Sequence, residues 1–195
     1  MTQSRIVSIA AVAALAAMSA TTTLADKSGG NGDDRDNDNT FATKLIGYNE
    51  TPLTINSTGS GTFVASINKD ATAISYTLTY RDLSSEVAQA HIHFGRPSLT
   101  GQIVLFLCFN PAVVAQPAGV PMPQTCPPPP ATISGTLTAA DVIARATQGI
   151  DGGAAGFAEM VKAIRAGAAY ANVHSVNFPT GEIRGALGPA DDDND

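Results

Sequence analysis

Alternation of apolar and polar residues is the feature that most limits how this chain can fold. Over residues 74–80 every second residue is large and apolar, and the residues between them are Ser or Thr. A period of two is typical of a strand with one buried face. Shorter runs of this kind recur at residues 44–48, 63–67, 87–94, 133–137, 168–176 and 182–187. We therefore predict a mainly β fold, an antiparallel sandwich or barrel.

One further strand is predicted from a different pattern. Residues 103–108 are continuously apolar, as expected of a strand that is buried on both faces. A long proline-containing stretch separates this strand from the next and ends in four consecutive prolines at 127–130.

Two short helices are expected before the last pair of strands. Thr138–Asp141 resembles a capping box with Asp in place of Glu, and predicts a helix that ends near Thr147. The second helix is predicted over residues 157–164, where apolar residues repeat at i, i+3, i+4 and i+7. Gly167 is placed to end it.

The first 25 residues have the pattern of an export signal. Arg5 precedes an apolar run from Ile6 to Met18, and Thr23-Leu24-Ala25 supplies a small-residue cleavage site. The run is shorter than the roughly 20 residues that a membrane-spanning helix needs. We expect cleavage after Ala25 and export of a chain without a membrane span, to the periplasm or the cell exterior.

The rest of the chain divides into three parts by composition. We expect a disordered acidic and Gly-rich linker over residues 26–42, one β domain over 43–188 and an acidic tail over 189–195. The whole sequence has 11 Lys and Arg against 17 Asp and Glu, a net charge of −6. This balance argues against a nucleic-acid partner. An extracellular or periplasmic protein is the expected partner, and the sequence does not identify it.

Cys108 and Cys126 are the only cysteines. They enclose the proline-containing loop, and in an oxidising compartment we expect them to form a disulfide. A reactive or metal-ligating thiol pair is the alternative, although the spacing has no CxxC pattern.

The three histidines of the chain all lie in predicted strands. His91 and His93 are two residues apart, so a strand places both on one face, opposite their apolar neighbours. His174 lies in a segment with the same alternation. Three imidazoles without a thiolate suit copper, zinc or nickel. The structural alternative is that His91 and His93 bond neighbouring loops, and that His174 pairs with a carboxylate such as Glu50 or Glu182.

Four segments of the chain resemble the chordin (CHRD) domain pattern. They are Leu45–Pro52, Ala90–His93, Ala166–His174 and Pro179–Gly185, within a match from about Thr43 to Leu187. Thr51 stands where the family often has valine, and the loop between the cysteines looks like an insertion. Members of this family are extracellular or exported, and their role in bacteria is poorly defined. The resemblance therefore implies a location and not a reaction.

A second resemblance is local. His91–Gly95 is similar to the strand of copper/zinc superoxide dismutases that supplies two copper ligands. It implies a Greek-key barrel with copper on its outside, and a surface site made by His91, His93 and His174. In that arrangement Ile92 and Val173 point inward. The chain lacks the fourth copper histidine and the zinc-binding loop of those enzymes.

Glu50, Glu182 and Arg184 are the expected surroundings of this site. If the last two strands pair, Glu182 and Arg184 lie close to His174, where Glu182 could orient a ligand and Arg184 could attract an anion. A simple ion pair between Glu182 and Arg184 is the other possibility. We therefore expect a non-enzymatic binding or structural domain, and copper binding by the three histidines, with zinc as second choice, is an additional hypothesis to be tested. The alternative is a copper-dependent, superoxide dismutase-like oxidoreductase.

Overall fold

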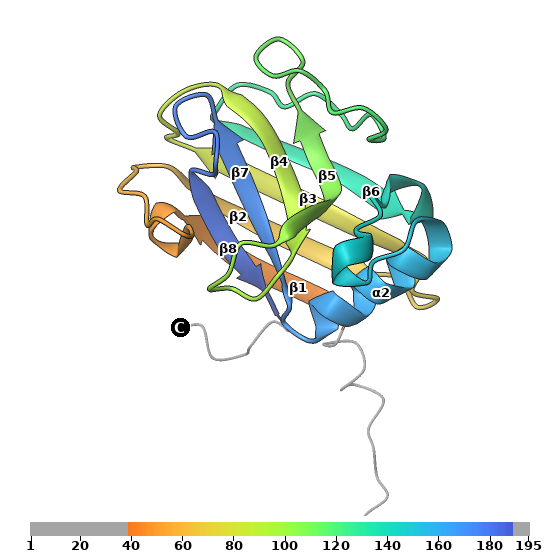
Figure 1. Ribbon diagram of the computed structural model, residues 1–195. Coiled ribbons are helices and arrows are strands. Elements are labelled where there is room, and N and C mark those ends of the chain that lie inside the picture. Colours follow the sequence, from red (N-terminus) through yellow and green to blue (C-terminus); the bar gives the residue numbers. More distant parts are fainter. Residues whose placement is uncertain (1–38, 189–195) are drawn as a thin grey trace, which may run out of the picture. The chain divides into compact units, whose positions relative to one another are not determined.

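The computed structural model of this protein describes residues 39–188. The expected export signal, the acidic tail and most of the linker lie outside this range and stay predictions. Within it, eight strands form one antiparallel sheet in the order β5-β4-β7-β8-β1-β2-β3-β6 (Figure 1). The strands are β1 (Thr40–Ile46), β2 (Ser60–Ile67), β3 (Ala73–Arg81), β4 (Val87–Phe94), β5 (Gln102–Phe109), β6 (Ala131–Thr138), β7 (Ala169–Ser175) and β8 (Ile183–Leu187).

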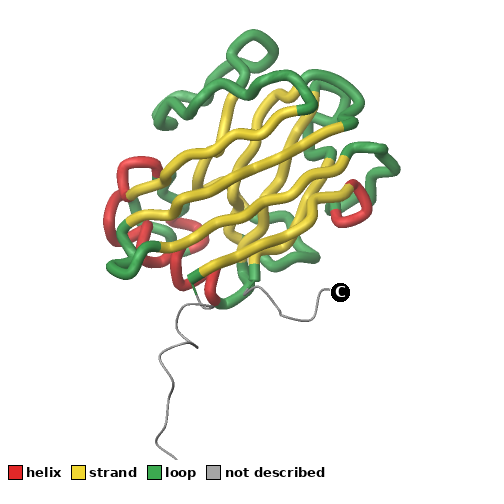
Figure 2. Tube along the Cα trace, turned by 180° about the vertical axis from the view of Figure 1, so that it is seen from behind, coloured by secondary structure: helices red, strands yellow, loops and turns green. Residues whose placement is uncertain are grey.

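The sheet curls until its two edge strands, β5 and β6, approach each other and nearly close a barrel. The Tyr76 hydroxyl on β3 donates a 2.7 Å hydrogen bond to the Leu107 carbonyl of β5, and Ile143 N donates to Val104 O of β5 at 2.9 Å. Helices and most loops lie at the ends of the strands (Figure 2). The sandwich-or-barrel prediction is thus resolved in favour of a barrel.

The core lies between the inward faces of the strands, as the alternation predicts. On β3 the residues Ile74, Tyr76, Leu78 and Tyr80 are all buried. Strand β5 is buried from Val104 to Phe109 on both faces, which confirms the prediction from its continuous apolar run. The first strand begins at Thr40, three residues before the boundary expected at Thr43.

Helix α2 (Gly153–Arg165) confirms the second predicted helix and packs into the core at one end of the barrel (Figure 1). Its apolar stripe is buried, and Gly167 follows it with a positive φ of 65°. No helix within residues 39–188 is long and apolar enough to cross a membrane.

The first predicted helix is wrong. Its segment forms two separate 3-10 turns, η2 (Ala139–Asp141) and η3 (Ala146–Gln148). The capping box is present, because the Thr138 backbone N–H donates to the Asp141 carboxylate and the Thr138 hydroxyl accepts from Ala140 N. The turn nevertheless stops, since Val142 is buried in the core and Ile143 N bonds to β5 instead of continuing a helix.

The topology is a meander of β1, β2 and β3 followed by strands that alternate between the two halves of the sheet. After β3 the chain forms the β4–β5 hairpin, returns with β6 beside β3, and returns again with β7 beside β4. Strand β8 then joins β7 to β1. The Greek-key connection that we expected is not confirmed by this order.

The predicted disulfide between Cys108 and Cys126 is present and lies at the seam between β5 and β6. Beside it, Phe109 forms a parallel bridge to Thr125, with hydrogen bonds from Phe109 N to Gln124 O and from Cys126 N to Phe109 O. The proline-containing loop is therefore fixed across the seam by one covalent bond and two backbone hydrogen bonds.

Removing this disulfide should destabilise the fold without preventing barrel formation. Replacing Cys108 and Cys126 together by Ala should lower the free energy of unfolding by about 3 kcal/mol, because the unfolded chain regains the entropy of the open loop. Urea denaturation of the oxidised wild type and the double variant measures this difference. An unchanged denaturation midpoint would show that the disulfide adds nothing to stability.

Candidate metal centre

The three histidines share one face of two neighbouring strands. His91 and His93 lie on β4 and His174 lies on β7, which pairs antiparallel with β4. Ile92 and Val173, on the opposite face of the same strands, belong to the hydrophobic core. The inward placement of Ile92 and Val173 and the common outer face of the three imidazoles are as the sequence predicts.

The imidazole rings lie in contact distance of one another. The ring centroids are 4.8 Å apart for His91 and His174, 5.4 Å for His91 and His93, and 6.3 Å for His93 and His174. One nitrogen from each ring lies within 4.8 Å of the other two. A metal bonded to imidazole at about 2.0–2.1 Å requires nitrogen pairs closer than about 4.2 Å, so ring movements of about an ångström bring all three into range.

The cluster is buried, and the expectation of a surface site is wrong. His91 is completely inaccessible, and His93 and His174 are 7% and 6% exposed. The reason is that loops fold over the outer face of β4 and β7. The β4–β5 loop brings the carbonyl of Gly101 against His93, and the β7–β8 loop brings that of Pro179 against His174.

These two carbonyls fix which nitrogen of each ring is free. Nδ1 of His93 lies 3.0 Å from Gly101 O, and Nδ1 of His174 lies 2.8 Å from Pro179 O. A carbonyl oxygen only accepts, so each Nδ1 carries the proton and each Nε2 presents its lone pair. Histidines that bind metals are held in this way, through a hydrogen bond from the other ring nitrogen.

The free nitrogens have no partner within the protein. Nε2 of His93 and of His174 and both ring nitrogens of His91 are buried and form no hydrogen bond. An unsatisfied buried polar group costs about 1–3 kcal/mol. The structural alternative, in which loops satisfy the histidines, thus accounts for only one nitrogen on each of two rings. A cation bound by one nitrogen of each ring would complete the partners of His93 and His174 and leave one nitrogen of His91 without a partner.

Burial also keeps the three rings uncharged. It lowers the pKa of His93 to about 3, lowers that of His174, and lowers that of His91 well below its ordinary value, where repulsion from His174 and His93 adds to the effect. A neutral imidazole is the form that binds metal. Protons therefore do not compete for these nitrogens near neutral pH.

Arg184 holds part of the cover over this face. Its guanidinium lies 3.4 Å from the centroid of the Tyr170 ring, which itself stacks on His93 at 4.5 Å. It donates hydrogen bonds to the Thr51 hydroxyl and to carbonyl oxygens of the β4–β5 loop, those of Arg96, Pro97 and Leu99. The Arg184 guanidinium is therefore bound to the covering loops. It does not form the ion pair with Glu182 that was considered from the sequence.

Neither glutamate is hydrogen-bonded to a histidine, although Glu182 N donates to the carbonyl of Val173, the residue before His174. Glu50 is buried and accepts a 2.6 Å hydrogen bond from the Asn172 amide. Glu182 accepts from the Ser57 hydroxyl at 2.5 Å and from the backbone and hydroxyl of Ser84 at 2.8 and 3.0 Å. No hydrogen bond links either carboxylate to His174, whose partner is a backbone carbonyl. The pairing of His174 with a carboxylate, which was part of the structural alternative, is therefore wrong.

Three residues of the site were not singled out from the sequence. Tyr170 and Asn172 alternate with core residues on β7 and precede His174 at intervals of two, so the strand pattern contained the signal. Phe106 packs against His91 with its ring perpendicular and 4.5 Å away. It lies in the continuous apolar run of residues 103–108, where nothing in the sequence distinguishes it.

Comparison with known families agrees with the resemblance found in the sequence. Residues 41–187 match the CHRD domain. The chain belongs to the CHRD domain family. No curated protein and no solved structure matches the chain. CHRD domains are typically extracellular, and the disulfide of this CHRD domain fits an oxidising compartment.

The segments that carry the CHRD resemblance meet around the buried histidines. The β1–β2 loop contributes Glu50, β7 contributes Asn172, and β8 contributes Arg184. In the β7–β8 loop, Gly181 has a φ of 129°, and a Cβ atom there would lie 2.6 Å from the Asn172 amide nitrogen and 2.7 Å from both Glu50 carboxylate oxygens. These segments of the CHRD domain thus form one closely packed polar layer.

Gly181 provides a test of how closely this layer is packed. Gly181→Ala should lower the free energy of unfolding by about 2–5 kcal/mol, because it adds a steric overlap to an unfavourable φ. Gly149→Ala is the matched control, since Gly149 has a φ of 74° but open space around its Cβ position, and should lose only about 1–2 kcal/mol. Equal losses in urea denaturation would show that the layer has room for a methyl group.

Glu50 should make stability depend on pH in a defined direction. Burial raises the pKa of Glu50 from 4.5 to about 7 in the folded CHRD domain. Between these values the folded chain holds a proton that the unfolded chain has lost, so the contribution of Glu50 to stability falls as pH rises to about 7 and is constant above it.

Glu50→Gln keeps a neutral acceptor for Asn172 and removes this titration. The free energy of unfolding of the variant minus that of the wild type should therefore increase between about pH 4.5 and 7. The difference is the quantity to measure, because the histidines with lowered pKa values act in the opposite direction and are common to both proteins. Urea denaturation across this pH range gives it, and a constant difference would contradict the prediction.

Proposed function

We propose that this protein is an exported CHRD-domain protein that binds one copper ion through His91, His93 and His174, without being an enzyme. The observation that carries the proposal is the set of buried imidazole nitrogens without a hydrogen-bond partner. The Nδ1 bonds of His93 and His174 to backbone carbonyls orient two of these nitrogens. Such a site suits storage or delivery of the metal, with a protein of the periplasm or cell exterior as the expected partner.

The donor set favours copper, with zinc as the second choice. Within residues 39–188 the cluster contains only imidazole, and no thiolate or carboxylate belongs to it. The two cysteines are joined in the disulfide. Imidazole suits both copper and zinc, and for a given set of nitrogen donors divalent copper binds more tightly than zinc.

The enclosure of the cluster favours binding over catalysis. A catalytic metal site keeps one position open to water or substrate, whereas His91, His93 and His174 are buried under loops. Nothing in the described part of the chain favours the dismutase-like alternative, and the sequence has only three histidines.

Metal titration tests the proposal directly. The full chain should take up copper in a single stoichiometric step, measured by competition with a copper chelator of known affinity. Free copper at about 100 times its dissociation constant should stabilise the fold by about 2.7 kcal/mol. For a domain of this size this corresponds to a rise in Tm of about 5–10 °C.

The matched pair of variants is His93→Ala and Gln89→Ala. Gln89 lies on the same strand as His93 and opposite His174, but is not part of the cluster. His93→Ala should lose the stoichiometric uptake and the rise in Tm, and Gln89→Ala should keep both. Absence of copper and zinc uptake by the wild type, or equal uptake by both variants, would refute the proposed site.

A further inference from the structure

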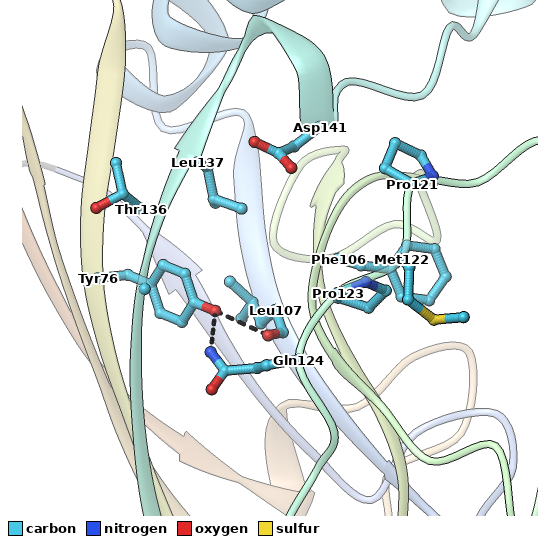
Figure 3. A pocket seen from close by; sticks show the side chains of 11 residues that line it. Tyr76, Phe106, Leu107, Pro121, Met122, Pro123, Gln124, Thr136, Leu137 and Asp141 are labelled. Atoms are coloured by element: carbon cyan, nitrogen blue, oxygen red, sulfur yellow. Dashed lines mark hydrogen bonds between the residues drawn. The ribbon is translucent and has the colours of Figure 1, made fainter.

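A cavity of about 200 Å³ lies at the seam between β5 and the proline-containing loop (Figure 3). Its wall includes Phe106, Met122 and Asp141, and the Gln124 amide donates to the Tyr76 hydroxyl at one side. Phe106 also packs against His91. A single aromatic ring therefore contacts both the cavity and the buried histidine cluster.

The other sides of the cluster are closed by hydrogen bonds. Arg184 binds three carbonyl groups of the β4–β5 loop, and that loop and the β7–β8 loop accept from His93 and His174. Opening either loop breaks the bonds that orient the ligand nitrogens. The Phe106 side chain has no polar atom, so a change of its rotamer moves it off His91 without breaking a hydrogen bond. The smallest structural change that exposes the cluster is therefore at Phe106.

The charges around the cluster also favour entry of a cation from the side of Phe106. On the side of His93, the guanidinium of Arg184 lies over the Tyr170 ring that stacks on His93, and its positive charge repels an arriving metal ion. On the side of Phe106, the wall of the cavity contains the carboxylate of Asp141.

Met122 adds a donor atom of defined preference to this cavity. Its side chain is 68% exposed, and the other methionine within residues 39–188, Met160, is buried in the core. A thioether is a soft ligand that selects monovalent copper and gives little to zinc or divalent copper. A single positive charge also costs less to bury among neutral imidazoles near Arg184 than a double charge does.

From these contacts we infer that copper reaches the three histidines in its monovalent form through this cavity, with Met122 as the first donor and Phe106 as the gate. This inference rests on the proposed copper site. The step is a ligand exchange: the bond from copper to the Met122 sulfur breaks as bonds to imidazole nitrogens form. Copper stays monovalent throughout, so no electron or proton is transferred.

The test measures the rate of copper loading separately from affinity. The full chain is mixed without oxygen with monovalent copper held by bicinchoninate, and the loss of the coloured chelate is followed by stopped flow. Met122→Leu should slow loading about tenfold, equivalent to a barrier higher by about 1.4 kcal/mol, with unchanged affinity at equilibrium. Phe106→Leu should speed both loading and release, as a smaller gate would, again with affinity unchanged.

Leu99→Ala is the control, since Leu99 is 58% exposed on the loop that covers the opposite side of the cluster, and its loading rate should equal that of the wild type. Wild-type loading rates in Met122→Leu, or a change in affinity instead of rate, would overturn the route and leave the copper site standing. Faster loading in Leu99→Ala would place the access on the opposite side. Absence of equilibrium uptake by the wild type would remove both the site and its route.

Discussion

The buried guanidinium of Arg184 is the interaction on which the covered face of the barrel depends. A cation of this size is expensive to bury, and it is retained only where hydrogen bonds and opposing charge compensate it. Here three backbone carbonyls, a hydroxyl and the face of Tyr170 surround it. The same contacts fix the β4–β5 loop, whose Gly101 carbonyl orients His93. Arg184 therefore connects the last strand of the fold to the orientation of the His93 imidazole.

The polar layer outside β4, β7 and β8 is satisfied everywhere except at the histidines and at one amide oxygen. Glu182 has three hydrogen-bond donors, and Glu50 accepts from Asn172. The exceptions are the imidazole nitrogens of the cluster and the side-chain oxygen of Asn172. Buried polar atoms in folded proteins are nearly always paired, and this concentrated group of exceptions is the observation that supports the proposed copper site.

Much of this architecture was predictable because strand patterns are local and strong. The alternation on β3 and the continuous apolar run of β5 specified buried faces that the barrel then uses. The common face of His91, His93 and His174 followed from the same period, once Ile92 and Val173 were assigned to the core.

The predictions that were wrong concerned features that depend on tertiary contacts. The capping box at Thr138 formed, but the backbone of Ile143 bonded to β5 and ended the turn. The burial of the histidines could not be predicted, because it is produced by loops whose path is set by Arg184 and by backbone carbonyls. The hydrogen bonds of Glu182 to Ser57 and Ser84 likewise depend on two loops that are 98 residues or more distant in the chain.

The disulfide at the barrel seam makes the position of the Met122 segment depend on oxidation of the two cysteines. The residues next to Cys126 include the segment that carries Met122, and the bond to Cys108 holds that segment across the gap between β5 and β6. A newly made chain whose thiols are still reduced lacks this tether. The two backbone hydrogen bonds at Phe109 then hold the segment without the covalent bond, so under the proposed route the oxidation state of the surroundings would affect how firmly the cavity wall is held.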